Sequence, residues 1–344
     1  MDFRSDNVTG VCPEVLAAIV AANDGSAAAY GEDAWTERAE RALADLFETP
    51  VAVFPVATGT AANALSLAAL TPVYGAVYAH EAAHITVDEC NAPEFYTGGA
   101  KIVPLPGDHG KIAAAHLARV LAGAAPHGHH NAQPAAVSLS QASEVGTVYG
   151  VDEVAAIAGV CRDHGVALHM DGARIANAVV HLGCSFADLT WRAGVDVLSF
   201  GATKNGAMAA EAVVFFDLAR AERMPFLRKR AGHLLSKMRF VSAQLEAYAR
   251  DDVWRRNAVH ANAAAARLVE GVRSLPGVEL VHPLHANEIF IRLPAKAIEG
   301  LAADGFRFHP WGDPATHAVR LVTGFSTTTA DVDRFVRRAQ ALCG

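Results

Sequence analysis

The stretch Val197-Leu-Ser-Phe-Gly-Ala-Thr-Lys204-Asn-Gly206 decides the fold, because an apolar run ends there in a turn of small residues that carries one lysine. A second stretch, Leu168-His-Met-Asp171-Gly-Ala-Arg174, places an aspartate 33 positions before that lysine. Each apolar run predicts a buried strand, and Phe186 to Arg192 predicts a helical crossover between them. Parallel strands joined by one crossover bring their carboxyl ends side by side. We therefore expect Asp171 and Lys204 to face one cleft.

An aspartate and a lysine in one cleft match the chemistry of pyridoxal phosphate. The lysine amine forms a Schiff base with the cofactor aldehyde, and the aspartate keeps the pyridine nitrogen protonated. The residues alone leave two alternatives open. Lys204 is a surface lysine in one of them, and Asp171 forms a structural ion pair with Arg174 in the other.

Composition limits the class of protein. The chain has 344 residues, of which 52% are apolar and 19% charged, and its net charge is −7. This profile indicates a globular protein and disfavours a nucleic-acid partner. No apolar run has the length of a membrane span, and the first residues lack a signal-peptide core. Five scattered cysteines without C-x-x-C spacing favour a reduced, cytoplasmic protein without a metal site.

Strands alternate with helices between residues 50 and 216, which predicts a mostly parallel sheet. Glu211 to Phe216 follows the lysine so closely that we expect an antiparallel neighbour. Two long helices, Phe226 to Arg250 and Asp252 to Ser274, precede a tail of short strands and a final helix. We expect a large domain over residues 1–245 and a smaller α+β domain over 246–344.

Two further segments suit cofactor binding. Thr58-Gly59-Thr60 lies between a strand and a helix, where free backbone N–H groups bind phosphate, although an ordinary helix cap is the alternative. His84 follows another strand, where an imidazole can cover a cofactor ring and move protons. Three histidines at 127, 129 and 130 have no nearby carboxylate or cysteine, so a solvated loop is favoured over a metal site.

Two arginines are candidates for binding a substrate carboxylate. Arg174 follows Asp171, and Arg320 lies in the apolar run Ala318-Val-Arg-Leu-Val322. A guanidinium forks onto a carboxylate with two parallel hydrogen bonds. Salt bridges within the protein are the alternative for both.

Together these segments resemble the threonine aldolases of the β-eliminating-lyase group, which have the aspartate-aminotransferase-like fold of pyridoxal-phosphate enzymes. The similarity runs in order from residue 3 to 206 and returns at Val319-Arg320-Leu321. The form Phe200-Gly-Ala-Thr-Lys204-Asn-Gly206 resembles the low-specificity L-threonine aldolase branch, which includes phenylserine aldolases. The matching segments are Phe3-Arg-Ser5-Asp6-Asn7-Val-Thr9, Tyr30-Gly-Glu-Asp33, Thr58-Gly-Thr-Ala-Ala-Asn63, Ala83-His-Ile85 and Met170-Asp-Gly-Ala-Arg174.

The resemblance implies a role for each matching residue. Catalysis falls to Lys204, which binds the cofactor aldehyde, to Asp171 at the pyridine nitrogen, and to His84 on the ring. The residues implied to bind the cofactor or the substrate are Gly59 and Thr60 at the phosphate, Arg174 near both, Ser5, Tyr30 and Arg320 at the substrate, and Arg228 reaching a neighbouring subunit's phosphate. It also implies a homotetramer, a dimer of dimers with active sites at the dimer interface.

One segment departs from the family pattern. Many relatives carry a histidine after the central strand that contacts the substrate hydroxyl, and here Ser140-Gln-Ala-Ser-Glu144 aligns with that segment. Glu144 falls at the histidine's position, so the base that acts on the hydroxyl is open.

The expected activity is therefore pyridoxal-phosphate-dependent cleavage of L-threonine, L-allo-threonine or phenylserine to glycine and an aldehyde. Another lyase reaction or a racemase reaction on the same cofactor is the first alternative, because fold and cofactor do not fix the reaction. A cofactor-free binding module is the second alternative. It requires the convergence of charged residues at the strand ends to be coincidental.

Overall fold

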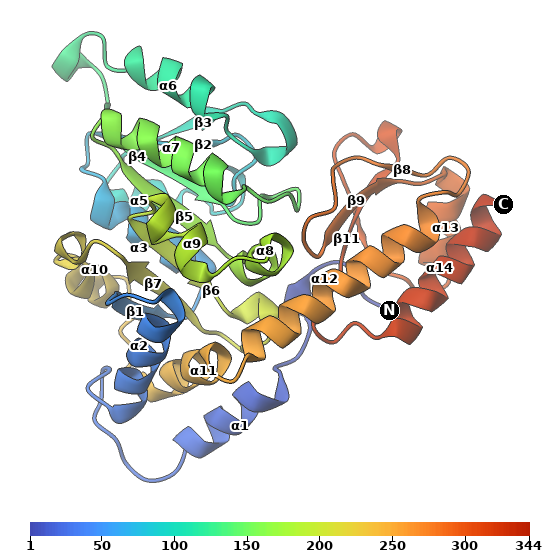
Figure 1. Ribbon diagram of the computed structural model, residues 1–344, viewed down its shortest axis with the longest axis horizontal. Helices are drawn as coiled ribbons and strands as arrows, with labels where there is room; N and C mark the ends of the chain where they lie inside the picture. The colour runs from blue at the N-terminus through green and yellow to red at the C-terminus, as the bar shows by residue number, and fades with distance from the viewer.

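A seven-stranded sheet forms the centre of the larger lobe in the computed structural model, which describes residues 1–344 (Figure 1). Neighbouring strands from β2 to β6 run parallel, whereas β7 is antiparallel to both β6 and β1. The antiparallel strand predicted after the lysine is thereby confirmed. The strand order is β1 (Ala52–Val56), β7 (Glu211–Phe215), β6 (Val197–Gly201), β5 (Ala167–Gly172), β4 (Gln133–Ser140), β2 (Gly75–His80) and β3 (Lys101–Leu105).

Helices cover both faces of this sheet, as expected for an α/β fold (Figure 1). Every residue of β5 is buried, because the strand is covered on both sides. The helices of this lobe are α1 (Pro13–Ala22), α2 (Ala34–Phe47), α3 (Gly59–Leu70), α4 (His84–Val87), α5 (Ala92–Thr97), α6 (Ala114–Ala122), α7 (Val151–Asp163), α8 (Ile175–Leu182), α9 (Phe186–Leu189), α10 (Met224–Arg230) and α11 (Arg239–Ala249).

A four-stranded antiparallel sheet forms the smaller lobe, and the 20-residue helix α12 (Val253–Val272) extends from the larger lobe along it (Figure 1). Met1 and Phe3 also join this lobe, because the Phe3 N–H donates to Arg307. A separate core of 17 buried residues lies there. Its other elements are β8 (Glu279–Leu280), β9 (Glu288–Arg292), α13 (Ala295–Ala303), β10 (His309–Pro310), β11 (Ala318–Val322) and α14 (Thr329–Cys343).

Two helix predictions were wrong in detail. The helix expected over Phe226 to Arg250 is two helices, α10 and α11, because the chain turns between them at Gly232, whose φ of +77° suits glycine. The crossover expected only at Phe186 to Arg192 also contains α8, and α9 within that range is a single short turn. Neither change moves the strand ends.

Close packing of two glycines brings the ends of β5 and β6 together. A Cβ on Gly201 would lie 2.7 Å from the Ala173 backbone, and one on Gly172 would lie 2.7 Å from the Leu198 side chain. Residues without a side chain are therefore required at this crossing. The two turns that carry Asp171 and Lys204 follow directly.

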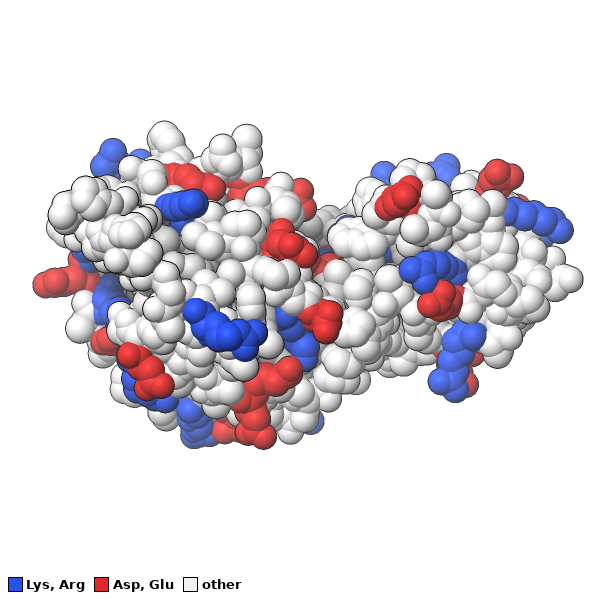
Figure 2. Space-filling view, turned by 90° about the horizontal axis from the view of Figure 1, so that it is seen from above, with Lys and Arg blue, Asp and Glu red and all other residues white.

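The face of the molecule seen in Figure 2 shows two lobes joined by a narrower waist, with acidic and basic side chains interspersed. No patch of one sign dominates this face. None of the helices combines the length and the apolarity needed to cross a membrane.

Candidate active site

A cavity of about 430 Å³ lies at the carboxyl ends of the parallel strands. This is where open α/β sheets bind their ligands. Six residues singled out from the sequence line it, from segments that follow β1, β2, β5 and β6. They are Gly59, Thr60, His84, Asp171, Arg174 and Lys204.

The α3 end of the cavity offers backbone donors. Thr58 caps α3, because its hydroxyl accepts from the Ala61 N–H at 3.1 Å. The Gly59 and Thr60 N–H groups precede the first bonded turn and make no hydrogen bond within the chain. Unpaired N–H groups and the helix dipole favour an anion there, so this end fits the phosphate of pyridoxal phosphate.

Asp171 is held rigidly at the end of β5. Its side chain is buried, and one carboxylate oxygen accepts from the Asn63 amide at 2.8 Å. The other oxygen accepts from the Ala173 N–H at 3.0 Å. These two hydrogen bonds keep the acceptor in place for a protonated ring nitrogen.

Lys204 lies on a short 3-10 turn, Thr203–Asn205, that hydrogen bonds of Asn205 hold in place. The Asn205 amide donates to the Tyr248 hydroxyl and to the Trp254 carbonyl, both at 2.8 Å. The lysine amine makes no hydrogen bond within the chain and faces the cavity. The backbone is therefore anchored while the amine stays available to an aldehyde.

Glu211 is a buried carboxyl in the same cavity that the sequence did not single out. It accepts from the Ala202 N–H at 3.0 Å, and burial raises the pKa of its carboxyl to about 7, against the opposing pull of the Thr203 hydrogen bond and the Lys204 charge. Its place at the start of β7, opposite Gly201, follows from the antiparallel pairing. No spacing rule in the sequence identifies it.

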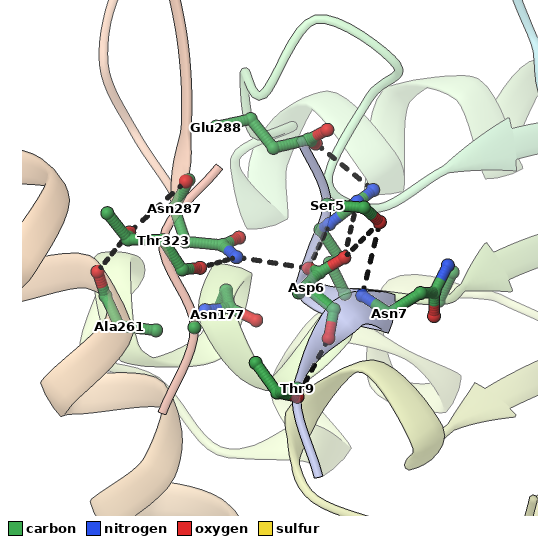
Figure 3. Close-up of polar contacts among 12 residues, drawn as sticks. Ser5, Asp6, Asn7, Thr9, Asn177, Ala261, Asn287, Glu288 and Thr323 are labelled. Atoms are coloured by element: carbon green, nitrogen blue, oxygen red, sulfur yellow. Dashed lines mark hydrogen bonds and ion pairs between the residues drawn. The ribbon is translucent and has the colours of Figure 1, made fainter. Parts of the chain in front are cut away.

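Arg174 is bound by two acidic side chains. Its Nε and Nη2 donate to the Asp6 carboxylate at 2.7 and 2.9 Å, and its Nη1 lies 3.2 Å from Glu288. Asn287 donates to Asp6 as well (Figure 3). Burial raises the pKa of Glu288 to about 7, although Arg174 pulls in the other direction. An ion-pair role, the alternative left open from the sequence, is therefore present beside any role toward a substrate.

His84 forms part of a hydrogen-bonded set that sequence reasoning missed. Its Nδ1 lies 2.8 Å from the Glu89 carboxylate, which is buried and also accepts from Asn63 at 2.8 Å. Glu89 lies five residues beyond His84 and two residues after α4 ends. That short spacing is the one signal in the sequence that could have identified it.

Glu144, which aligns with the hydroxyl-contacting histidine of many relatives, also lines the cavity. Its side chain makes no hydrogen bond within the chain. Burial raises the pKa of the Glu144 carboxyl, Asp171 adds to the shift, and the charges of Lys204, Arg174 and His84 oppose it. Glu144 and His84 are therefore candidate proton acceptors in the same cavity.

Four predicted site residues do not line the cavity of the single chain. Ser5 caps a short turn through the Asn7 N–H. Tyr30 is about half exposed, with the Lys229 amine 4.6 Å from its ring centre. Arg228 lies over the Phe54 ring, and its Nε is buried without a partner. Arg320 donates to the Arg4 carbonyl, and its Nε is likewise unpartnered. Their roles stay predictions.

The fold and the cavity together define an α/β enzyme of the aspartate-aminotransferase-like type, with a site that fits pyridoxal phosphate. The family model described as beta-eliminating lyase matches residues 2–295. The chain belongs to the beta-eliminating lyase family.

Relatives and solved structures agree with this placement. A low specificity L-threonine aldolase of Pseudomonas aeruginosa is 47% identical over 89% of this chain and 88% of its own length. A Pseudomonas sp. protein of the same name is 45% identical over the same shares. A solved threonine aldolase of Leishmania major, 28% identical, covers 100% of this chain and 99% of its own with a TM-score of 0.94. An aspartate aminotransferase of Rhodobacter sphaeroides, at 18% identity and a TM-score of 0.70, shares the fold, covering 100% of this chain and 92% of its own.

Proposed function

We propose that this chain is a pyridoxal-phosphate-dependent aldehyde-lyase that cleaves L-threonine, L-allo-threonine and related β-hydroxy-α-amino acids, such as phenylserine, to glycine and an aldehyde. One observation carries the proposal. The cavity joins Lys204, Asp171 and a phosphate-binding turn in a chain whose relatives, 45–47% identical, are low specificity L-threonine aldolases.

Pyridoxal phosphate, when bound, supplies an electron sink for the bond that breaks. The chain's own residues hold and orient. Lys204 holds the aldehyde end, Asp171 keeps the ring nitrogen protonated, and Gly59 and Thr60 bind the phosphate. His84 covers the ring. These assignments rest on the placement of the five side chains and backbone segments around one cavity.

The substrate carboxylate must be fixed so that the Cα–Cβ bond stands perpendicular to the ring, because orientation decides which bond breaks. We assign this to Arg320 and Arg174, with Ser5 nearby. The unpartnered Nε of Arg320 supports its part. Arg174 already binds Asp6 and Glu288, so it contributes through whatever donor capacity these two leave.

We also propose a homotetramer with active sites at the dimer interface, located in the cytoplasm. The support comes from Arg228 and Tyr30, which do not line the cavity of their own chain, as expected of residues that serve the cavity of a neighbour. The division into a large domain over residues 1–245 and a smaller domain over residues 246–344 stays a prediction. Analytical ultracentrifugation of wild type and of Arg228→Ala tests the assembly.

The activity is tested by measuring aldehyde release from L-threonine, L-allo-threonine and L-phenylserine, with the visible spectrum recorded before and after substrate. Aldehyde from at least one substrate, by a yellow protein, is the expected result. A yellow protein that yields pyruvate or racemised substrate but no aldehyde would establish the lyase or racemase alternative instead.

A further inference from the structure

A single side-chain amide links two buried carboxylates beside the cavity. The Nδ2 of Asn63 lies 2.8 Å from Glu89 Oε1 and 2.8 Å from Asp171 Oδ2. An amide nitrogen carries two hydrogens, so it donates to both. Glu89 Oε1 also lies 2.8 Å from His84 Nδ1. Hydrogen bonds therefore run without a break from His84 through Glu89 and Asn63 to Asp171.

These partners determine which nitrogen of His84 carries its proton. Burial raises the pKa of Glu89, and its hydrogen bonds from His84 and Asn63 oppose that shift. An ionised Glu89 only accepts hydrogen bonds, so His84 Nδ1 donates to it. In the neutral imidazole the other nitrogen, Nε2, then holds the lone pair. Nε2 makes no hydrogen bond within the chain, and His84 lines the cavity. Nε2, on the side of the imidazole away from Glu89, is thus the atom of His84 that can accept a proton.

We propose that Glu89 is a positioning residue that holds His84 with Nδ1 protonated, so that Nε2 takes the proton of the substrate β-hydroxyl. This rests on the proposed function. As the Cα–Cβ bond breaks, the hydroxyl oxygen becomes the aldehyde oxygen and its proton moves to Nε2. The electron pair stays with Cα. That proton then passes to Cα, which completes glycine and restores neutral His84, so atoms and charge balance.

In many hydrolases, a carboxylate orients the histidine that activates the nucleophile. Glu89 orients His84 in the same way, and here the histidine removes the proton of an alcohol. Glu89 suits this part because its side chain is buried, and it is fixed from a second direction by Asn63. Asn63 also holds Asp171, so one amide sets the position of both the ring partner and the orienting carboxylate.

Three acidic groups face His84 from different elements. Glu89 follows α4, Glu144 follows β4, and Asp171 ends β5. The hydrogen bond to Glu89 raises the pKa of His84, burial opposes it, and the charges of Glu144, Glu89 and Asp171 raise it further. Lys204 shares the same cavity. Since a base must be neutral to act, the pKa of His84 sets the acidic limb of the pH–rate profile.

Glu144 is the competing acceptor, because it faces the cavity without a hydrogen-bond partner. The two assignments predict different pH profiles. If His84 is the base, Glu89→Gln lowers the pKa of His84 and moves the acidic limb of the pH–rate profile to lower pH. If Glu144 is the base, Glu89→Gln leaves the acidic limb unmoved and Glu144→Gln abolishes turnover.

The experiment compares wild type, Glu89→Gln, Glu144→Gln and the control Asp88→Asn, each loaded with cofactor. Asp88 is the neighbouring carboxylate in the chain and is exposed. Histidine labelled with ¹⁵N gives the tautomer and titration of His84 by NMR, with His84→Phe used to assign the signal. Aldehyde release is followed as kcat and kcat/KM from pH 5 to 9.

The expected result has three parts. In wild type and Asp88→Asn, neutral His84 carries its proton on Nδ1. In Glu89→Gln, the His84 titration and the acidic limb of kcat/KM both move to lower pH, and kcat falls roughly 10-fold or more, because a less basic imidazole is the poorer base. Glu144→Gln keeps measurable kcat with an acidic limb.

Any of three results would overturn the proposal. One is a neutral His84 protonated on Nε2 in wild type. Another is a Glu89→Gln variant with unchanged kcat and unchanged acidic limb. The third is a Glu144→Gln variant without turnover. The NMR measurement does not depend on turnover. A wild-type protein that releases no aldehyde but shows the Nδ1-protonated His84 would therefore contradict the proposed function while leaving the positioning by Glu89 intact.

Discussion

At the scale of single residues, the site depends on a few charges fixed by neutral donors. Asp171 keeps its orientation through an amide and a backbone N–H, neither of which competes for its negative charge. The nearest full positive charges in the cavity are Lys204 and Arg174, and Arg174 is occupied by Asp6. The Asp171 carboxylate is therefore free to stabilise a protonated ring nitrogen.

The Asp171→Asn variant removes this charge at nearly constant shape. We expect kcat for aldehyde release to fall roughly 10²-fold or more, because the pyridine nitrogen loses the charge that keeps it protonated. The measurement is steady-state turnover, with cofactor content checked by absorbance. Asp163→Asn at the exposed end of α7 is the control. Full activity in Asp171→Asn would show that Asp171 does not keep the pyridine nitrogen protonated.

At the scale of elements, the approach of β5 to β6 positions the two catalytic turns. Gly172 and Gly201 form this contact, and a side chain on either would meet atoms of the other strand or its turn below 3 Å. Helix α3 packs against both strands and brings Asn63 to Asp171. The relative placement of Asp171 and Lys204 is thus a property of the sheet.

Gly201→Ala tests this packing. The new methyl would lie 2.7 Å from the Ala173 backbone, which cannot move aside as a flexible side chain would. We expect a loss of about 1–3 kcal/mol in the free energy of unfolding, together with reduced activity. Urea denaturation measures the first and aldehyde release the second. Gly10→Ala is the matched control, because its Cβ meets nothing within 4 Å. Equal stability of the two variants would refute the packing argument.

Sequence patterns located the strands that end at Asp171 and before Lys204, and the strand from Glu211, within one or two residues of β5, β6 and β7, because buried strands are continuous apolar runs. They did not predict the two-residue strand β10. They missed the break between α10 and α11, because a single glycine such as Gly232 is tolerated within a helical pattern and does not by itself mark its end. They found Asp171, Lys204 and His84 through turn and strand-end positions. Glu89 and Glu211 escaped, because their importance comes from which strand ends adjoin in space.

At the scale of the whole molecule, an ion pair joins the N-terminal arm to both lobes. Asp6 in the arm binds Arg174 of the larger lobe. Asp6 also accepts from Asn287, which precedes β9 of the smaller lobe (Figure 3). Glu288 approaches the same guanidinium. All four side chains are buried, so loss of Asp6 leaves the Arg174 guanidinium with Glu288 as its one remaining acidic partner.

Asp6→Ala should therefore lower the free energy of unfolding by about 3–5 kcal/mol, the usual cost of breaking a buried pair. Burial would raise the pKa of Asp6, but Arg174 holds it below the ordinary value. A depressed acid stabilises the fold above its unfolded pKa, about 4, and this contribution disappears as the pH falls through the folded pKa.

Urea denaturation of wild type and Asp6→Ala at pH 7 and at pH values below about 4 checks both statements. The difference between the two proteins should shrink in acid. Asp24→Ala is the control that should change little, because Asp24 is exposed and its side chain makes no hydrogen bond or ion pair within the chain. A pH-independent difference would show that Asp6 acts through packing and not through its charge.

The most direct test of the account is to identify the residue that holds the cofactor. Borohydride treatment of the yellow protein fixes the bound cofactor covalently to the lysine it is linked to, and peptide mass spectrometry locates the adduct. We predict one modified peptide, carrying the cofactor on Lys204, and no adduct in Lys204→Ala. Modification of another lysine, or an unchanged adduct in Lys204→Ala, would contradict the assignment of the site.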